Sequence, residues 1–296
     1  MTLYESLAPL YDGLFPVDPR AIPFLESLVG VEPGTAGPRV LDAGCATGAH
    51  AVSLATRGWN AVGIDSEAAM IAKAREGALR EGVAERASFF EMDILEIGKS
   101  FRGRGFDLVL CLGNTLPHLV GTDRGAESVG DPEAASFLGQ ARELLSPRGA
   151  LVLQTLNFSL AGVGPGFEFP ELAVGDAVMK RSYRDPPPER PGTLRFVVEL
   201  SRRWESQRAE TFLVPLGPRR VASLLREAGL PDQARFAGWD GRPFDEGGDQ
   251  YCVTVARPSP ATAKKRSPLA AGVESDPDRL YNLLVNPARP ATRGWY

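Results

Sequence analysis

Cysteine and histidine are scarce in this chain, and the few that occur do not form a pattern typical of cross-links or metal binding. The chain has 296 residues but only three cysteines, Cys45, Cys111 and Cys252, and two histidines, His50 and His118. None of their spacings is a CxxC pair or a zinc-ligand pattern. A chain of this length also buries enough apolar surface to fold without disulfides. We therefore expect reduced thiols, no metal site and a cytoplasmic location.

Long apolar runs and an excess of basic charge are absent as well. No apolar run approaches the roughly 18 residues that a membrane span needs, and a net charge of −4 gives no overall attraction to nucleic acid or to an anionic membrane. A secretory or transit peptide is disfavoured by four early acids, Glu5, Asp12, Asp18 and Glu26. The composition, with 43% hydrophobic and 24% charged residues, is that of a globular protein. We expect a small-molecule partner, with no nucleic acid and no membrane.

What the chain does have is an alternation of short apolar runs and longer amphipathic stretches between residues 39 and 157. This pattern is typical of an α/β fold with a doubly wound, mostly parallel sheet. The expected strands are 40–43, 61–65, 88–92, 106–112 and 150–156. The expected helices are 51–57, 67–81 and 132–145, the last with Asp131 as its N-cap ahead of Pro132.

The segments outside this region have different patterns. Residues 3–30 read as one or two amphipathic helices, the second of which opens after Pro19. After residue 157, period-two segments at 177–183, 194–200 and 212–216 predict an antiparallel insert, followed by a helix at 218–228 and a strand at 251–256. The resulting division is a helical lid (1–36), a core (37–158 and 217–257), a substrate-side insert (159–216) and a Pro-rich tail (258–296), with helical spacing in the tail only at 276–286.

The segment that carries chemical information runs from Val40 to His50, where a strand leads into a Gly-rich turn and then a helix. Gly44 and Gly48 allow a sharp turn and leave room for a ligand against the backbone. The next strand ends in Asp65, whose carboxylate is suited to accept hydrogen bonds from both hydroxyls of an adenosine ribose. The spacing departs from the dinucleotide fingerprint G-x-G-x-x-G.

This segment resembles the first motif of the class I S-adenosylmethionine-dependent methyltransferases, D-x-G-x-G-x-G, with Ala46 in place of the middle glycine. Three later segments match the same family in order: 90–94, 106–114 and 138–156. The resemblance implies a seven-stranded Rossmann-like sheet, S-adenosylmethionine as cofactor and methyl transfer as the activity. The stretch 111–119 further resembles the glycine/sarcosine N-methyltransferase-like group. Residue by residue, the resemblance implies the following cofactor-binding residues: Tyr11, Gly44, Ala46, Asp65, Asp93, Ile94, Leu112, Asn114 and His118.

The methyl acceptor is left open by the sequence. The glycine-methylating enzymes carry an Arg-Asn-Tyr triplet after the fifth strand, whose Arg binds the substrate carboxylate, and here Leu156-Asn157-Phe158 stands there. Glycine is therefore not carried over as the substrate, and the acceptor atom is a nitrogen or an oxygen. Asn157 either ends a strand or contacts substrate, and Tyr183 is a second candidate substrate residue.

No acid-base pair stands out, so no catalytic residue is assigned. We expect Asn157, with Tyr183 or Tyr11, to position a nucleophile whose own ionisation sets the rate. His118 is expected to contact the cofactor, whereas His50 is expected to cap a helix or face solvent.

Between positions 180 and 208 there are eight basic residues and only four acids. The basic residues either lie on the solvated face of a hairpin or form a clamp for an acidic substrate. A protein that binds cofactor without catalysis and acts as an interaction module is the alternative function. A homo-oligomer formed through the insert or tail also remains open.

Overall fold

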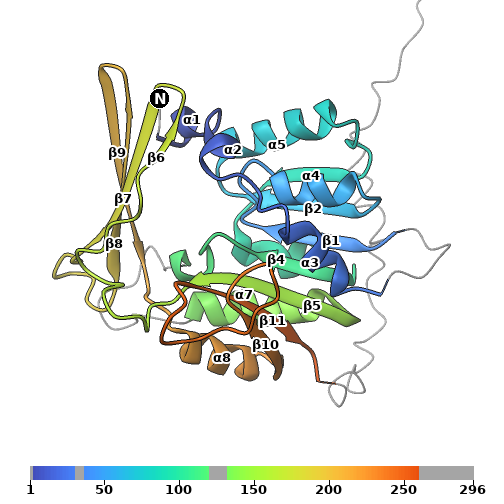
Figure 1. Ribbon diagram of the computed structural model, residues 1–296. Coiled ribbons are helices and arrows are strands. Elements are labelled where there is room, and N and C mark those ends of the chain that lie inside the picture. Colours follow the sequence, from blue (N-terminus) through green and yellow to red (C-terminus); the bar gives the residue numbers. More distant parts are fainter. Residues whose placement is uncertain (1–2, 31–36, 120–131, 260–296) are drawn as a thin grey trace, which may run out of the picture.

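The computed structural model of the chain describes residues 3–30, 37–119 and 132–259. Within these residues the strands form two sheets, a seven-stranded central sheet in the order β10-β11-β5-β4-β1-β2-β3 and a four-stranded sheet that stands beside it (Figure 1). The central strands are β1 (Arg39–Ala43), β2 (Asn60–Asp65), β3 (Ala87–Glu91), β4 (Phe106–Cys111), β5 (Leu145–Leu156), β10 (Asp232–Phe236) and β11 (Tyr251–Arg257).

The central sheet has the predicted doubly wound arrangement. Strand β1 pairs in parallel with both β2 and β4, and the parallel pairing continues outward to β3 on one side and to β5 on the other. Strand β11 runs antiparallel to β5, and β10 antiparallel to β11. The chain order therefore reverses between β1 and β4, and the carboxyl ends of the strands at such a switch point form a crevice for ligands.

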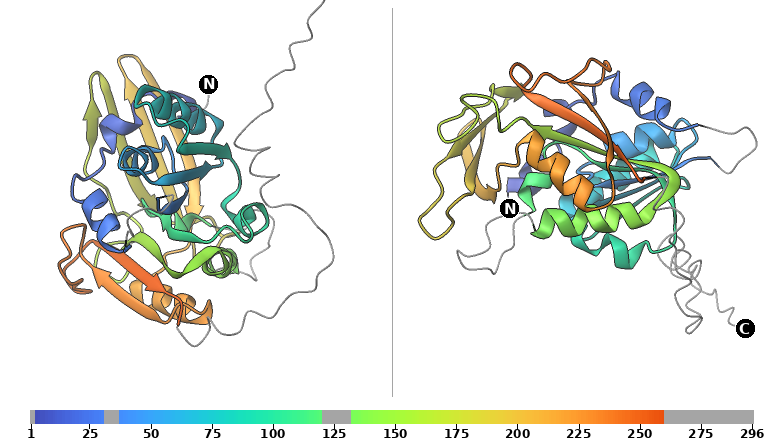
Figure 2. Two further views of the ribbon diagram at one scale, coloured as in Figure 1. Left: turned by 90° about the vertical axis from the view of Figure 1, so that its right-hand side faces the viewer. Right: turned by 90° about the horizontal axis from the view of Figure 1, so that it is seen from below.

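Helices cover both faces of this sheet (Figures 1 and 2). On β1, Val40 joins a cluster with α3 (Ala21–Ser27), α4 (Ala49–Ala55) and α5 (Ala68–Arg80). The next residue, Leu41, points to the opposite face and joins a cluster whose helices are α6 (Ile97–Ser100), α7 (Pro132–Leu144) and α8 (Pro218–Glu227). Both faces of β1 are thus buried, as expected of a central parallel strand. No helix in the described ranges is both long and apolar enough to cross a bilayer.

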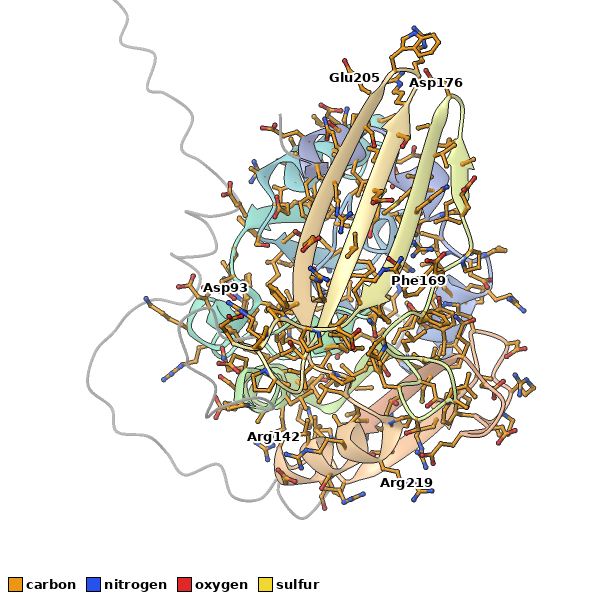
Figure 3. The ribbon with its side chains drawn as sticks, turned by 90° about the vertical axis from the view of Figure 1, so that its left-hand side faces the viewer. Asp93, Arg142, Phe169, Asp176, Glu205 and Arg219 are labelled. Atoms are coloured by element: carbon orange, nitrogen blue, oxygen red, sulfur yellow. The ribbon has the colours of Figure 1, made fainter. Side chains whose placement is uncertain are left out.

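The antiparallel insert consists of β6 (Leu172–Val174), β7 (Ala177–Arg184), β8 (Leu194–Arg202) and β9 (Glu205–Leu213), in that order across the sheet. Seen from its own side, it lies in front of the central sheet (Figure 3). Its inner face packs against α1 (Leu3–Leu7), where Leu3 and Leu7 share an apolar cluster with Met179 and Val198. The N-terminal helices and the insert together form a roof over one end of the central sheet.

The differences from the sequence-based elements lie mainly at sheet edges. Strand β9 begins at residue 205 rather than 212, because its first residues are polar and largely exposed and so carry no apolar run. Strands β6 and β10 were not predicted, since each is a short edge strand. The N-terminal segment forms three short helices, including α2 (Tyr11–Leu14), rather than one or two. The predicted N-cap Asp131 and the predicted tail helix at 276–286 lie outside the described residues.

Candidate functional site

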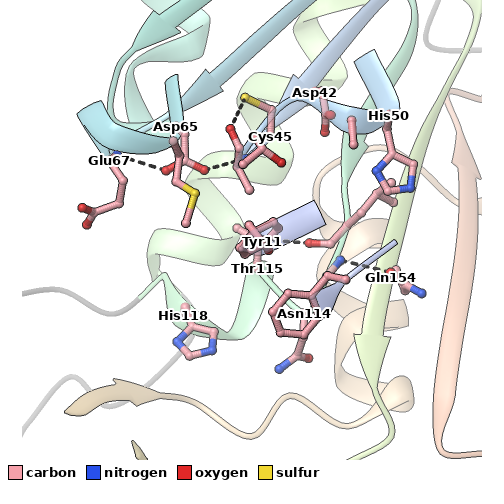
Figure 4. Close-up of a pocket in the computed structure, with 18 of the residues that line it drawn as sticks. Tyr11, Asp42, Cys45, His50, Asp65, Glu67, Asn114, Thr115, His118 and Gln154 are labelled. Atoms are coloured by element: carbon pink, nitrogen blue, oxygen red, sulfur yellow. Dashed lines mark hydrogen bonds between the residues drawn. The ribbon is translucent and has the colours of Figure 1, made fainter. Parts of the chain in front are cut away.

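A cavity of about 1180 Å³ lies at the carboxyl ends of the central strands, beneath the roof (Figure 4). Its wall combines the Gly-rich turn after β1, the ends of β2 and β3, the loop after β4, helix α2 and the inner face of β7 and β8. Small-molecule pockets commonly measure roughly 300–1,000 Å³. The cavity therefore has room for more than one small ligand.

The Gly-rich turn is fixed to the neighbouring strand by backbone hydrogen bonds. The N–H groups of Gly44 and Cys45 both donate to the carbonyl of Ile64, at 2.9 and 2.8 Å. Gly44 and Gly48 have φ values of +80° and +74°, and Ala46 lies in the same left-handed region at +47°. This region favours glycine, and alanine has the smallest side chain of the other residues. Ala46 therefore adds little bulk at the position where the related motif has its middle glycine.

Asp65, at the end of β2, holds this turn and the start of α5 together. Its carboxylate accepts hydrogen bonds from the backbone N–H of Ala46 at 2.9 Å and from that of Glu67 at 3.0 Å (Figure 4). Burial raises the pKa of this carboxyl group, and the hydrogen bonds from the backbone partly offset that effect. The acid thus lies on the cavity wall with its oxygens beside the turn, where hydroxyl donors of a ligand can reach it.

Carboxyl groups concentrate at this end of the cavity. Asp42, only 2% exposed, is on the cavity wall with Asp65 and Glu67. Burial, and secondarily the charge of Asp65, raises the pKa of Asp42 to about 7. For Asp42 and Glu67, neighbouring carboxylates add to the effect of burial in raising the pKa, and no cation of the described chain is among the causes of the shift at any of the three groups. This end of the cavity is therefore suited to a positively charged ligand.

The loop after β4 connects the central sheet to the insert through Asn114. The backbone N–H of Asn114 donates to the Gln154 carbonyl at 2.9 Å, and its side-chain oxygen accepts from the Leu156 N–H at 2.8 Å. Its amide nitrogen donates to the Tyr183 hydroxyl at 3.4 Å. Asn114 has φ +66°, a conformation that asparagine tolerates better than most residues. A single side chain thereby positions Tyr183 over the cavity.

The N-terminal helix α2 closes the cavity on the side of the Gly-rich turn. The Thr47 hydroxyl donates a hydrogen bond to the Asp12 carboxylate, which joins the turn to the helix. Tyr11 lies next to it on the cavity wall, and burial is the main cause that raises its pKa. The Tyr11 ring also contacts that of Phe15, with centroids 4.9 Å apart.

Comparison with known proteins agrees with this geometry. A family model described as a methyltransferase domain matches residues 35–179. The fold is similar to that of a methyltransferase from Streptomyces caelestis, CcbJ, with a TM-score of 0.69 and 24% identity over 87% of this chain and 98% of that one. It is also similar to that of an S-adenosylmethionine-dependent methyltransferase from Clostridium acetobutylicum, with a TM-score of 0.68 and 14% identity over 86% of this chain and 99% of that one. The chain belongs to the S-adenosylmethionine-dependent methyltransferases. S-adenosylmethionine is the cofactor of this enzyme family.

Curated relatives differ in the atom that they methylate. A glycine/sarcosine N-methyltransferase from Halorhodospira halochloris is 31% identical over 120 residues, 40% of each chain. A ubiquinone biosynthesis O-methyltransferase from Pseudomonas aeruginosa is 30% identical over 153 residues, 52% of this chain and 56% of the relative. The chain thus matches only about half the length of these relatives. The likeness supports the family and leaves the acceptor atom of this methyltransferase to be proposed.

The structure brings the residues proposed for cofactor binding to one cavity. Asp93 (Figure 3) and Ile94 follow β3, the edge strand of the central sheet. The Asp93 carboxylate caps a short 3-10 helix (Ile94–Glu96) by accepting from the Leu95 N–H at 2.8 Å. The full set on the wall is Tyr11, Gly44, Ala46, Asp65, Asp93, Ile94, Leu112, Asn114 and His118, together with Tyr183 from the proposed substrate residues.

Both histidines line the cavity of this methyltransferase and are uncharged at neutral pH. Burial lowers the pKa of His118 to about 4, and a hydrogen bond involving the backbone of Phe212 only partly opposes this. Burial also lowers the pKa of His50 to about 4. The expectation that His50 faces solvent is wrong, because the ring lies on the cavity wall 6.5 Å from that of Trp239. Trp239 comes from the loop between β10 and β11, which no local pattern around His50 could reveal.

Asn157 comes directly after β5, and its side chain is occupied by hydrogen bonds within the chain. Its side chain is fully buried, and the amide nitrogen donates to the carbonyls of Glu246 and Asp249 at 2.8 and 2.9 Å. The amide oxygen accepts from the Ser159 N–H at 3.1 Å, and the residue is not part of the cavity wall. Its hydrogen-bonding groups are used to fasten the loop before β11. Asn157→Ala would therefore act on stability rather than on the alignment of an acceptor.

The basic stretch of the insert is largely a solvated surface. Six of its eight cations form ion pairs on that surface: Lys180, Arg184, Arg195, Arg202, Arg203 and Arg208. Arg190 lies over the Phe212 ring, 4.6 Å from its centroid. Arg181 is the exception, because its side chain lines the cavity.

Proposed function

We propose that this protein transfers a methyl group from S-adenosylmethionine to a nitrogen or oxygen of a small molecule bound beneath the antiparallel insert. The observation that carries the proposal is the position of Asp65, hydrogen-bonded to the Gly-rich turn at the carboxyl end of β2 and on the wall of a cavity with room for two ligands. Asp65, the Gly-rich turn and the cavity occur together at the switch point of the sheet, where such folds bind ligands.

The residues of the cavity fit the cofactor chemically. Asp65 would bind the ribose hydroxyls, and the Gly44 to Gly48 turn would hold the amino-acid end. Asp93 and Leu112 would enclose the adenine on its polar and apolar sides. The cofactor carries positive charge, and the carboxyl groups at this end, including the buried Asp42, would favour it over a neutral or anionic ligand.

The chain's own residues provide alignment rather than proton transfer. When bound, S-adenosylmethionine supplies a methyl group on a sulfonium sulfur, already activated for in-line displacement. Tyr183, held by Asn114, and Tyr11 lie on the wall and would position the nucleophile. His118, with a pKa of about 4, is a weak base at neutral pH and is suited to contact rather than to proton abstraction.

Calorimetry followed by turnover tests this function. We expect the purified full-length protein to bind both S-adenosylmethionine and S-adenosylhomocysteine, and to produce S-adenosylhomocysteine in the presence of members of a panel of amines, phenols and carboxylic acids. If the protein bound neither S-adenosylmethionine nor S-adenosylhomocysteine, the proposal would be contradicted. Binding without turnover on any member of the panel would instead favour the non-catalytic interaction module.

Cofactor affinity should depend on pH through Asp42. Its raised pKa of about 7 means that the carboxyl group of the free protein is largely protonated at lower pH. A bound cation favours the ionised form, so binding below neutrality must release a proton, and affinity should rise by up to roughly tenfold per unit between about pH 5.5 and 7 and then level off. Calorimetry in buffers of different ionisation enthalpy measures that proton.

The matched control for this prediction is Asp42→Asn, which should bind without proton release in the same range. In the free protein, the raised pKa has the opposite effect on stability, which should fall as pH rises between the ordinary value of 3.8 and about 7. An affinity that is flat or that falls with rising pH in the wild-type protein would show that no cation lies near Asp42 in the complex.

A further inference from the structure

Arg181 is the one arginine of the cavity wall without an ion-pair partner among the described residues. The wall includes three arginines, and two of them are neutralised within the chain, Arg20 by Asp18 at 2.6 Å and Arg242 by Asp249 at 2.5 Å. No carboxylate of the described chain pairs with Arg181, and its buried Nε has no hydrogen-bond partner there. Within the described residues, this charged group thus keeps an unmet hydrogen-bond donor.

The position of this guanidinium is defined by two aromatic rings. Along β7, Met179, Arg181 and Tyr183 alternate onto the inner face and line the cavity. The guanidinium carbon lies 5.0 Å from the centroid of the Phe15 ring and 4.7 Å from that of Phe169. Contacts with ring faces hold the planar group in place without consuming its N–H donors. Burial lowers the pKa of Arg181, but from a value so high that it stays charged.

Charge is therefore distributed unequally between the two ends of the cavity. Asp42, Asp65 and Glu67 gather by the Gly-rich turn, whereas Arg181 projects from the roof. Leu156, the last residue of β5, stands where the related glycine-methylating group has an arginine, and it lines this cavity with an apolar side chain. An anionic group of the acceptor would thus be bound from the roof rather than from the central sheet.

We propose that the methyl acceptor is an aromatic or alicyclic carboxylic acid, and that Arg181 binds its carboxylate. The inference rests on the proposed methyl transfer and names the substrate class of that site. A guanidinium offers paired donors whose spacing matches the two oxygens of a carboxylate. Around it, Phe15, Phe169, Phe196 and Met179 supply an apolar wall for a ring-sized body. The ring would carry the amine or hydroxyl group that is methylated.

Matched acid and amide probes test this assignment by calorimetry on the full-length protein saturated with S-adenosylhomocysteine. The pairs are benzoate and benzamide, phenylacetate and phenylacetamide, and cyclohexanecarboxylate and its carboxamide. The acid should bind more tightly than the amide by roughly 10- to 100-fold in at least one pair, which is the range for a charged hydrogen-bonded contact. Arg181→Gln should remove this preference, and Arg181→Lys should retain part of it because the charge remains but the planar fork is lost.

Lys180→Gln is the matched control, because it removes a positive charge from the adjacent, exposed position of the same strand and should leave the preference unchanged. Failure of the wild-type protein to bind S-adenosylhomocysteine would contradict the proposed function itself. Binding of S-adenosylhomocysteine without an acid preference in any pair, including no binding of either member, would overturn only this inference. The inference would also fail if Arg181→Gln lost affinity for S-adenosylhomocysteine, since Arg181 would then serve the cofactor, or if phenyl phosphate bound more tightly than every carboxylate.

Discussion

Replacement of Asp65 by alanine is expected to weaken the binding of S-adenosylhomocysteine by roughly 30- to 100-fold, because two ribose hydroxyls would lose a charged acceptor. The same substitution leaves the N–H groups of Ala46 and Glu67 without their present partner, so the turn that faces the ligand would also become less ordered. Isothermal titration calorimetry measures the change in affinity. The raised pKa of Asp65 shows that its burial is costly, and this offsets part of the stability lost with the hydrogen bonds.

Glu91→Ala provides the control for this experiment. Glu91 ends the neighbouring strand β3 and pairs in register with Asp65, but its side chain is exposed and does not line the cavity. The Glu91→Ala substitution removes the same charge as Asp65→Ala, at a similar position on the sheet. Affinity should stay close to wild type in Glu91→Ala, and an equal loss in both variants would indicate a general electrostatic effect rather than a contact with the ribose.

Gly48→Ala should lower the free energy of unfolding by about 2–5 kcal/mol, of which about 1–2 comes from the left-handed backbone and the rest from overpacking. At φ +74°, a Cβ on Gly48 would lie 2.5 Å from the Phe89 ring and 2.9 Å from the Cβ of Ala74. Both neighbours are buried, Ala74 on α5 and Phe89 on β3, so neither has space to withdraw. Urea denaturation followed by circular dichroism measures the loss.

The comparison that isolates the crowding is Gly58→Ala. Gly58 has an equally unfavourable φ of +92°, but a Cβ there would meet no atom within 4 Å. We expect a loss of only about 1–2 kcal/mol, from the backbone alone. Similar losses in the two variants would mean that Phe89 adjusts at little cost and that the close packing of the turn is not decisive.

A valine at Gly44 would be a poor probe of contact with the cofactor. A Cβ at this position would lie 2.8 Å from the Thr115 methyl group, and the backbone has φ +80°. The substitution would disturb the protein itself as well as the ligand. Asp65 is the better test, since its side chain reaches the cavity without filling a tightly packed space.

The half of the site that would bind the cofactor could be predicted from sequence because its parts are local. The Gly-rich turn follows β1 directly, Asp65 is the last residue of β2, and Asp93 comes just after β3. Parallel strands bring their carboxyl ends to one edge whatever the details of packing, so the order of the motifs was enough to place these residues together. The apolar alternation likewise determined the central strands, whose burial on both faces leaves a clear pattern.

The other half was decided only by the tertiary structure. Alternation along β7 shows that Arg181 and Lys180 lie on opposite faces, but not which face covers the cavity, because that depends on how the insert docks against α1 and the central sheet. Asn157 is a polar residue at a strand end, and only the distant loop at Glu246 and Asp249 makes it a structural residue. His50 becomes part of the wall through Trp239, far along the chain. The sequence by itself thus determined the parallel sheet and the turn that it supports, whereas the roof and the side chains that it presents depended on long-range packing.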